Sequence, residues 1–133
     1  MYTLFTRKRN NRKGFSLIEL LIVIAIIGII ATIAIPLLLS ARNNAINEKA
    51  RNSLRSVSSA QAAYYAANGA YGTLVQLTGA APPYLDARFV DGADIGQGII
   101  VTEVAVATDT FTVTCGHPNL TLYSVTETGQ ITP

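Results

Sequence analysis

An uncharged apolar stretch from residue 20 to residue 41 constrains this chain more than any other feature. Its core, residues 20–39, reads LLIVIAIIGIIATIAIPLLL. As a helix, this core rises about 1.5 Å per residue and spans about 30 Å, which matches the hydrocarbon layer of a bilayer. It is apolar on every side, so the helix has no face suited to water. The sequence therefore predicts a membrane-spanning helix near the N-terminus.

The charges before this stretch predict its orientation. The first 14 residues hold half of the ten basic residues and no acidic one, whereas the remainder holds five basic and eight acidic residues. Positive charge beside an apolar helix stays on the cytoplasmic side of a membrane. A basic tip on a mildly acidic body does not indicate a nucleic-acid-binding protein. The basic residues of the tip are Arg7, Lys8, Arg9, Arg12 and Lys13.

Two ordinary explanations compete for the apolar stretch. A secretory signal peptide has an apolar core of about 7–15 residues followed by a small-x-small cleavage site. Here the stretch is longer, and no such site is placed cleanly after it. An unspecialised membrane anchor remains open on hydropathy alone.

The residues at the start of the stretch are more specific, and they read KGFSLIEL from Lys13 to Leu20. An ionised Glu19 beside hydrocarbon is costly by several kcal/mol unless it is paired. If the chain began at Phe15, a new α-amine would lie one turn away and would be its natural partner. The alternative is a carboxylate that reaches to the lipid headgroups.

Together with the apolar helix, Gly14-Phe15-Ser16-Leu17-Ile18-Glu19 resembles the class III signal of type IV pilins and type II secretion pseudopilins, over about residues 12–45. The resemblance implies cleavage between Gly14 and Phe15 by a prepilin peptidase, N-methylation of Phe15, and a register-setting role for Glu19 during filament assembly. It also implies several partners, namely other copies of the chain, the peptidase/methyltransferase, the inner-membrane assembly machinery, minor pilins and, before assembly, membrane lipid.

Three functions follow as hypotheses. The first is a structural subunit of a type IV pilus that supports motility, adhesion or DNA uptake. The second is a pseudopilin of a type II secretion system, and the third is a membrane-tethered sensor or enzyme. The first two predict a single-pass inner-membrane precursor with a cytoplasmic N-terminus, which then enters an extracellular pilus, or a periplasmic one for a pseudopilin.

Gly28 and Pro36 weaken the helix inside the apolar stretch. Pro36 has no N–H for the Thr32 carbonyl, and Gly28 adds backbone freedom. A tolerated kink is one interpretation. The resemblance implies another, in which residues 28–36 lose helical order when the filament assembles.

Residues 42–68 continue the helix with a different character. Apolar residues recur at steps of three or four, which predicts one packed face. Asn68-Gly69 is a helix stop, so we expect one helix over residues 15–67. The apolar stripe comprises Ile46, Ala50, Leu54, Val57, Ala60 or Gln61, and Tyr64, and the face expected in solvent carries Asn47, Lys49, Arg51, Asn52 and Arg55.

The remainder predicts a small head. Residues 69–98 are rich in Gly and Pro and read as a loop, pinned at its start by Tyr71, Leu74 and Leu77. Three strands are expected at 99–107, 110–115 and 120–126, with a terminal turn after them. The fold class is therefore α+β, a long N-terminal helix with a small antiparallel sheet, as in the pilin fold. The expected parts are the leader 1–14, the membrane or filament-core helix 15–41, the amphipathic half 42–68, the loop 69–98 and the sheet 99–133.

The sequence offers little chemistry. The alternation of the second strand places the single Cys115 on its buried face, and Cys115 with His117 lacks an acidic or amide partner nearby. Asp86, Asp91 and Asp94 do not have the spacing of a calcium loop. We expect no enzyme activity, catalytic residue, metal site or cofactor. Asn119-Leu120-Thr121 fits a glycosylation sequon, which is a weak signal.

Overall fold

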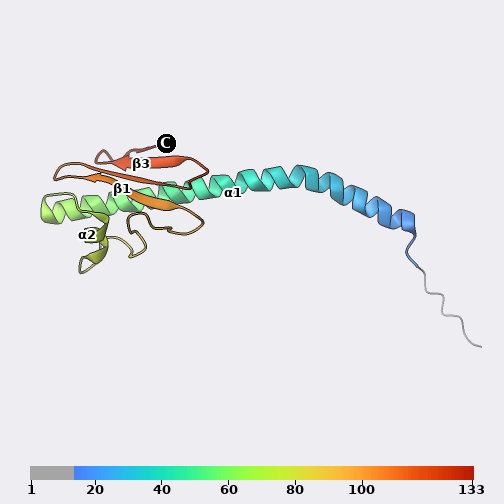
Figure 1. Cartoon of the computed structure of the whole chain (residues 1–133), viewed down its shortest axis with the longest axis horizontal. Helices are drawn as coiled ribbons and strands as arrows, with labels where there is room; N and C mark the ends of the chain where they lie inside the picture. The colour runs from blue at the N-terminus through green and yellow to red at the C-terminus, as the bar shows by residue number, and fades with distance from the viewer. Residues whose placement is uncertain (1–13) are drawn as a thin grey trace, which may run out of the picture. The chain divides into compact units, whose positions relative to one another are not determined.

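The computed structural model describes residues 14–133 (Figure 1). The leader predicted over residues 1–14 lies outside the described residues except for Gly14. The described chain falls into two units, residues 14–38 and residues 39–133, which we describe separately. Its elements are α1 (Leu17–Asn68), α2 (Leu74–Gly79), β1 (Ile100–Val106), β2 (Phe111–Gly116), β3 (Leu122–Thr126) and β4 (Ile131–Thr132).

Helix α1 confirms the single long helix that the sequence predicts. It ends at Asn68, where Gly69 adopts a φ of +71° that favours glycine. From residue 39 onward its apolar stripe is buried as expected, apart from Tyr64, which is half-buried, and Gln61 is buried with it. The prediction that the opposite face lies in solvent is partly wrong, because Asn47, Lys49 and Arg51 are half-buried. The buried residues of α1 are Ile46, Ala50, Leu54, Val57, Ala60 and Gln61.

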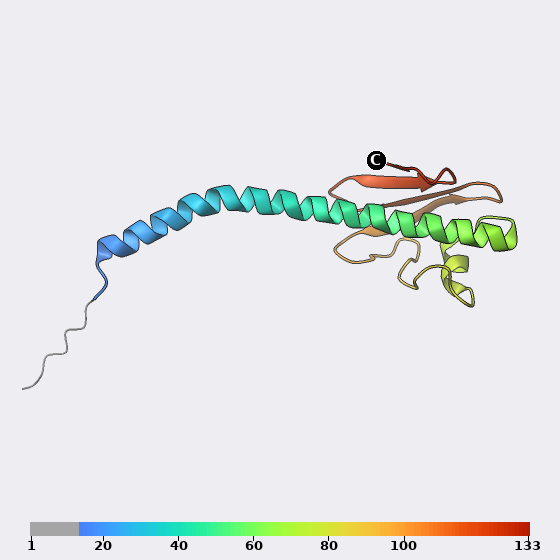
Figure 2. The same cartoon turned by 180° about the vertical axis from the view of Figure 1, so that it is seen from behind.

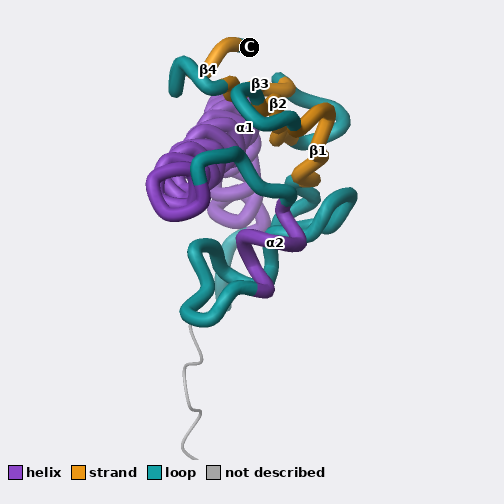
Figure 3. The backbone as a smooth tube through the Cα atoms, turned by 90° about the vertical axis from the view of Figure 1, so that its left-hand side faces the viewer, coloured by secondary structure: helices purple, strands orange, loops and turns teal. Residues whose placement is uncertain are grey.

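The head, residues 39–133, places an antiparallel sheet along one side of α1, with α2 and the following loop on another side (Figures 2 and 3). The strand order is β1-β2-β3-β4, and consecutive strands pair. Because side chains alternate along a strand, every second residue of β2 faces α1. Phe111, Val113 and Cys115 are buried there, which confirms the predicted phase.

Two elements of the head were missed by the sequence prediction. β4 follows the turn at Gly129, so the sheet has four strands where three were expected. α2 lies in the segment predicted as a loop. Thr73 caps it by accepting a hydrogen bond from the backbone N–H of Gln76, whose side chain accepts in turn from the N–H of Thr73. This capping box was present in the sequence as Thr-x-x-Gln and was not used.

The start of the loop is fixed to α1 by a buried amide. Gln61 donates to the Gly72 carbonyl at 2.6 Å and accepts from the Gly72 N–H at 3.0 Å. Leu74 and Leu77 are fully buried, and Tyr71 packs at the edge of the core. The expectation that these three residues pin the loop is therefore confirmed.

Candidate assembly segment

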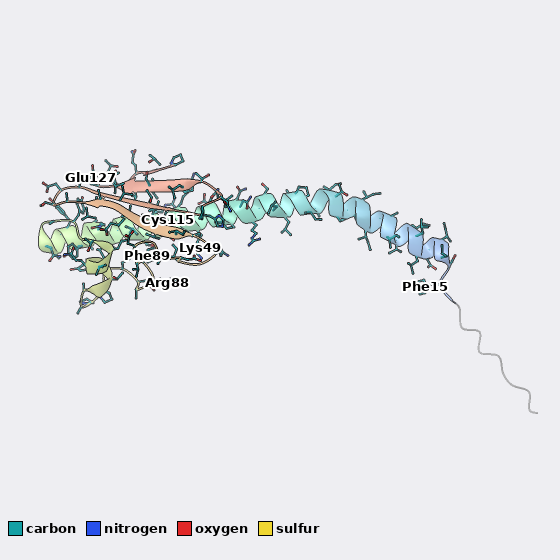
Figure 4. The ribbon with its side chains drawn as sticks, in the orientation of Figure 1. Phe15, Lys49, Arg88, Phe89, Cys115 and Glu127 are labelled. Carbon is teal, nitrogen blue, oxygen red and sulfur yellow. The ribbon has the colours of Figure 1, made fainter. Side chains whose placement is uncertain are left out.

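The predicted cleavage site lies just before α1. Gly14, Phe15 and Ser16 are exposed and have no regular secondary structure, and the first helical residue is Leu17. Figure 4 marks Phe15 at the start of the helical ribbon. Among the described residues, apart from its chain neighbours, no atom lies within 4 Å of the position where a Gly14 Cβ would be. An exposed non-helical backbone is the form in which a peptidase can bind this peptide bond.

Glu19 lies in the first turn of α1 and is exposed. Its backbone N–H donates to the Ser16 carbonyl at 3.1 Å, and its carboxylate has no ion-pair or hydrogen-bond partner among residues 14–133. A carboxylate in the first turn of a helix interacts favourably with the partial positive charge of the helix N-terminus, so Glu19 stabilises the start of α1. That interaction does not neutralise the charge, so the pairing of Glu19 with a terminal amine stays a prediction.

The rest of the segment exposes apolar side chains on all sides. In residues 15–39, Ala31 is the one residue that is half-buried, and every other side chain is exposed. Within the described part of the chain, α1 is the one helix long and apolar enough to cross a membrane, judged by length and composition. A shallow apolar hollow lined by Phe15, Leu17, Leu20, Leu21 and Ile24 lies at its start. Such a surface is stable in lipid or against other protein, and not in water.

The middle of this segment contains the two residues predicted to weaken it. α1 continues through Pro36, which donates no hydrogen bond to the preceding turn. The Thr32 hydroxyl donates to the Gly28 carbonyl at 2.8 Å. No side chain approaches the Cβ position of Gly28 within 4 Å, so nothing within the described chain requires a glycine there. Loss of helical order over residues 28–36 stays a prediction.

Cys115 and His117 do not form a reactive pair. Cys115 is completely buried, and burial raises the pKa of its thiol to about 12, while the nearby Lys49 charge acts in the opposite direction. A thiol with such a pKa is protonated at neutral pH and is a poor nucleophile. The Nδ1 atom of His117 instead accepts a hydrogen bond from the Asn119 N–H at 3.1 Å.

The three loop aspartates serve three different local contacts. Asp86 pairs with Arg88 at 3.0 Å, Asp91 accepts from the Glu103 N–H, and Asp94 accepts from the N–H groups of its own turn. The hydrogen bonds from Arg88 hold the pKa of Asp86 below its usual value. No group of three or more His, Cys, Asp or Glu side chains with the geometry of a metal site occurs in residues 14–133.

The N-terminal part of the chain matches a known sequence family. Residues 9–35 match the prokaryotic N-terminal methylation motif, which defines a class of proteins by this segment. The chain is also 35% identical over 77 residues to the type IV major pilin protein PilA of Myxococcus xanthus, covering 58% of this chain and 35% of the relative. It is 69% identical over 35 residues to the type IV wide pilus major component PilA4 of Thermus thermophilus, covering 26% of this chain and 27% of the relative.

The matched parts thus span 35% and 27% of the length of these two relatives. The motif, the relatives and the α+β fold with its apolar N-terminal helix agree with one another. Residues 9–35 therefore carry the prokaryotic N-terminal methylation motif, and the chain is similar in its N-terminal part to the major components of two type IV pili.

Proposed function

We propose that this chain is a structural subunit that polymerises through residues 15–41 into a type IV pilus. The observation that carries the proposal is the apolar surface of residues 15–39, which surrounds the helix and is covered by nothing in the described chain. Before assembly the segment lies in the inner membrane as a single-pass anchor, with its basic tip in the cytoplasm. In the filament the same surface contacts the helices of other copies.

Processing at Gly14 prepares the helix for this exchange. Cleavage between Gly14 and Phe15 by a prepilin peptidase removes the basic residues and creates an α-amine, which the methyltransferase activity then modifies on Phe15. The Glu19 carboxylate of a neighbouring copy pairs with that amine and sets the register between helices. Residues 28–36 unwind during assembly, around the carbonyl of Thr32 that Pro36 leaves without its helical donor. The assembled pilus is extracellular, is built with minor pilins, and supports motility, adhesion or DNA uptake.

The alternative of a type II secretion pseudopilin has less support. The two relatives named above are pilus components, and their names give no indication of a secretion system. The loop aspartates, which do not have the spacing of a calcium loop, are each used in a local contact. A catalytic role likewise has no support from the Cys115 environment.

The direct test replaces Glu19 with valine in a strain that contains the assembly machinery. We expect Glu19→Val to abolish sheared surface fibres, because the terminal amine loses its partner, while the precursor still accumulates in the membrane. Glu48→Val is the matched control, since Glu48 is an exposed acid of the same helix whose one ion pair is with Arg51 at 3.7 Å. Normal fibres from Glu19→Val would show that the proposed role of Glu19 is wrong.

The cleavage site has its own test. A large charged side chain at position 14 should block the approach of the peptidase to an otherwise open backbone, so Gly14→Glu is expected to leave the chain uncleaved and outside the filament. Gly14→Ala is the matched control and should be processed. Intact mass spectrometry of the membrane-bound chain distinguishes the two forms.

A further inference from the structure

Most charged side chains of the head are already used within it. In residues 39–133, five of the seven acidic side chains form an ion pair or accept a hydrogen bond from the backbone, and they are Glu48, Asp86, Asp91, Asp94 and Glu103. Asp109 and Glu127 have no such partner among the described residues, and both are exposed. Asp109 and Glu127 are therefore the two acidic side chains of the head that have neither an ion pair nor a hydrogen bond among the described residues.

Asp109 and Glu127 lie at the same end of the sheet. Asp109 is in the turn between β1 and β2, and Glu127 is in the turn between β3 and β4. The antiparallel pairing of Thr112 with Thr126 places both turns at the same end of the sheet. The Tyr71 N–H donates to the Thr108 carbonyl at 3.0 Å, so this end of the sheet contacts the chain just after α1. Figure 4 shows Glu127 at the end of the head where α1 ends.

The end of α1 adds to the negative charge there. A helix C-terminus carries a partial negative charge, which a basic residue in the last turn usually offsets. The last turn of α1 contains no basic residue. Asp109, Glu127 and the helix C-terminus together make this the acidic end of the head.

Arg42 lies at the opposite end of the head. Arg42 is exposed and has no ion-pair or hydrogen-bond partner in the part of the chain that the structure describes. It precedes Asn68 by 26 residues of α1, which is about 40 Å of helix. The other basic side chains of the head contact groups of their own chain: Lys49 contacts the Gly96 carbonyl, Arg51 contacts Glu48 and the Tyr123 ring, Arg55 contacts Asn52, and Arg88 contacts Asp86.

We propose that Arg42 of one copy pairs with Asp109 and Glu127 of a second copy, so that the heads join end to end. The inference rests on the proposed polymerisation and adds a second contact to that of the apolar helices. Opposite charges at the two ends of one head do not satisfy each other within a chain. They suit a heterologous contact, which repeats in an open-ended assembly and does not close into a dimer. Such an arrangement also fixes the direction in which copies add.

The contact is weak for each pair and depends on salt. Exposed ion pairs change an equilibrium by about fivefold at most, and salt screens them over about 10 Å at 0.1 M. Because the contact repeats at every subunit, its loss lowers the stability of the filament as a whole. Filaments should therefore dissociate at a lower temperature in high salt than in low salt.

Charge reversal tests the proposal. We expect Arg42→Glu, or the double change Asp109→Lys with Glu127→Lys, to reduce sheared filament about two- to fivefold and to remove the salt dependence of its dissociation temperature. Combining the three changes reverses both sides of the contact and should restore filament yield and salt dependence. Arg55→Glu with the two lysine changes is the matched control and should not restore them.

The outcomes separate this inference from the proposed function. If both charge-reversal variants form filaments with the wild-type yield and salt response, the head contact is wrong and the proposed polymerisation still stands. A loss from Arg42→Glu that the acidic-end changes do not rescue would also overturn it, and would indicate that Arg42 binds anionic lipid headgroups instead. If the wild-type chain forms no filament, the proposed function itself fails. Circular dichroism of each detergent-solubilised variant checks that the head is folded.

Discussion

The two units of this chain differ in how far their apolar side chains are buried. In residues 39–133 the apolar side chains of α1 pack against the sheet and the loop, and Leu54 and Val57 are completely buried. In residues 15–38 every apolar side chain except the half-buried Ala31 is exposed. The head therefore finds its core within its own sequence, whereas the N-terminal segment must find its packing partners elsewhere. The proposed function depends on this difference, since it requires a helix that exchanges lipid for other copies of the chain.

The largest expected effect compares one apolar truncation in each unit. Leu54→Ala should destabilise the head by about 3 kcal/mol, because it removes a fully buried side chain and leaves a cavity. Ile33→Ala is the matched change at an exposed position and should leave the stability of the head unchanged. Thermal unfolding of the detergent-solubilised full chain measures both. Equal destabilisation by the two variants would contradict the contrast between the units.

The sequence was most informative where one physical rule dominates. The apolar stretch and the helical spacing that follows it predicted the long helix α1. The glycine at residue 69, which adopts a left-handed conformation, predicted the end of the helix at Asn68. The phase of β2 followed from its strict alternation. Each of these predictions depended on local pattern alone.

The remainder depended on contacts that local pattern does not specify. Arg51 lies over the Tyr123 ring at 4.7 Å, although its position on the helix suggested solvent. β4 has two residues, which is too short for an alternation to be recognised. The absence of a partner for Asp109, Glu127 and Arg42 became visible only when the hydrogen bonds of the other charged residues were known.

A smaller effect is expected where the loop joins α1. Gln61→Ala removes both hydrogen-bond partners of the buried Gly72 backbone, which should reduce the stability of the head by about 2 kcal/mol. Amide hydrogen exchange should then quicken at the start of the loop before it does in the sheet. Asn52→Ala, on an exposed turn of the same helix, serves as the control. Unchanged exchange at Gly72 would show that the amide contact does not hold the loop.

The cap of α2 should contribute less. Thr73→Ala removes the side-chain acceptor for the Gln76 N–H, at an expected loss of about 1 kcal/mol. Thr73→Ser keeps the hydroxyl and should restore most of the stability. The same unfolding measurement should rank the losses of stability in the order Leu54→Ala, Gln61→Ala and Thr73→Ala.

The smallest expected effect on the stability of the head at neutral pH comes from the raised pKa of the Cys115 thiol. Since burial raises the pKa of its thiol from 9.0 to about 12, the folded head holds the proton more tightly than the unfolded chain does. The associated stability is fully present below pH 9 and is lost as the pH rises toward 12. Alkylation of the folded chain at pH 8 should therefore be much slower than alkylation of the unfolded chain. Equal rates would show that the thiol is accessible.

The central claim is that the exposed helix is freed at Phe15 and then buried among copies of itself. Mass spectrometry of fibres sheared from cells tests it most directly. We expect this chain to be a bulk component of the fibres, to begin at Phe15, and to carry a methyl group on that terminus. A chain that keeps the residues before Phe15, and that stays in the membrane while fibres form without it, would contradict the claim.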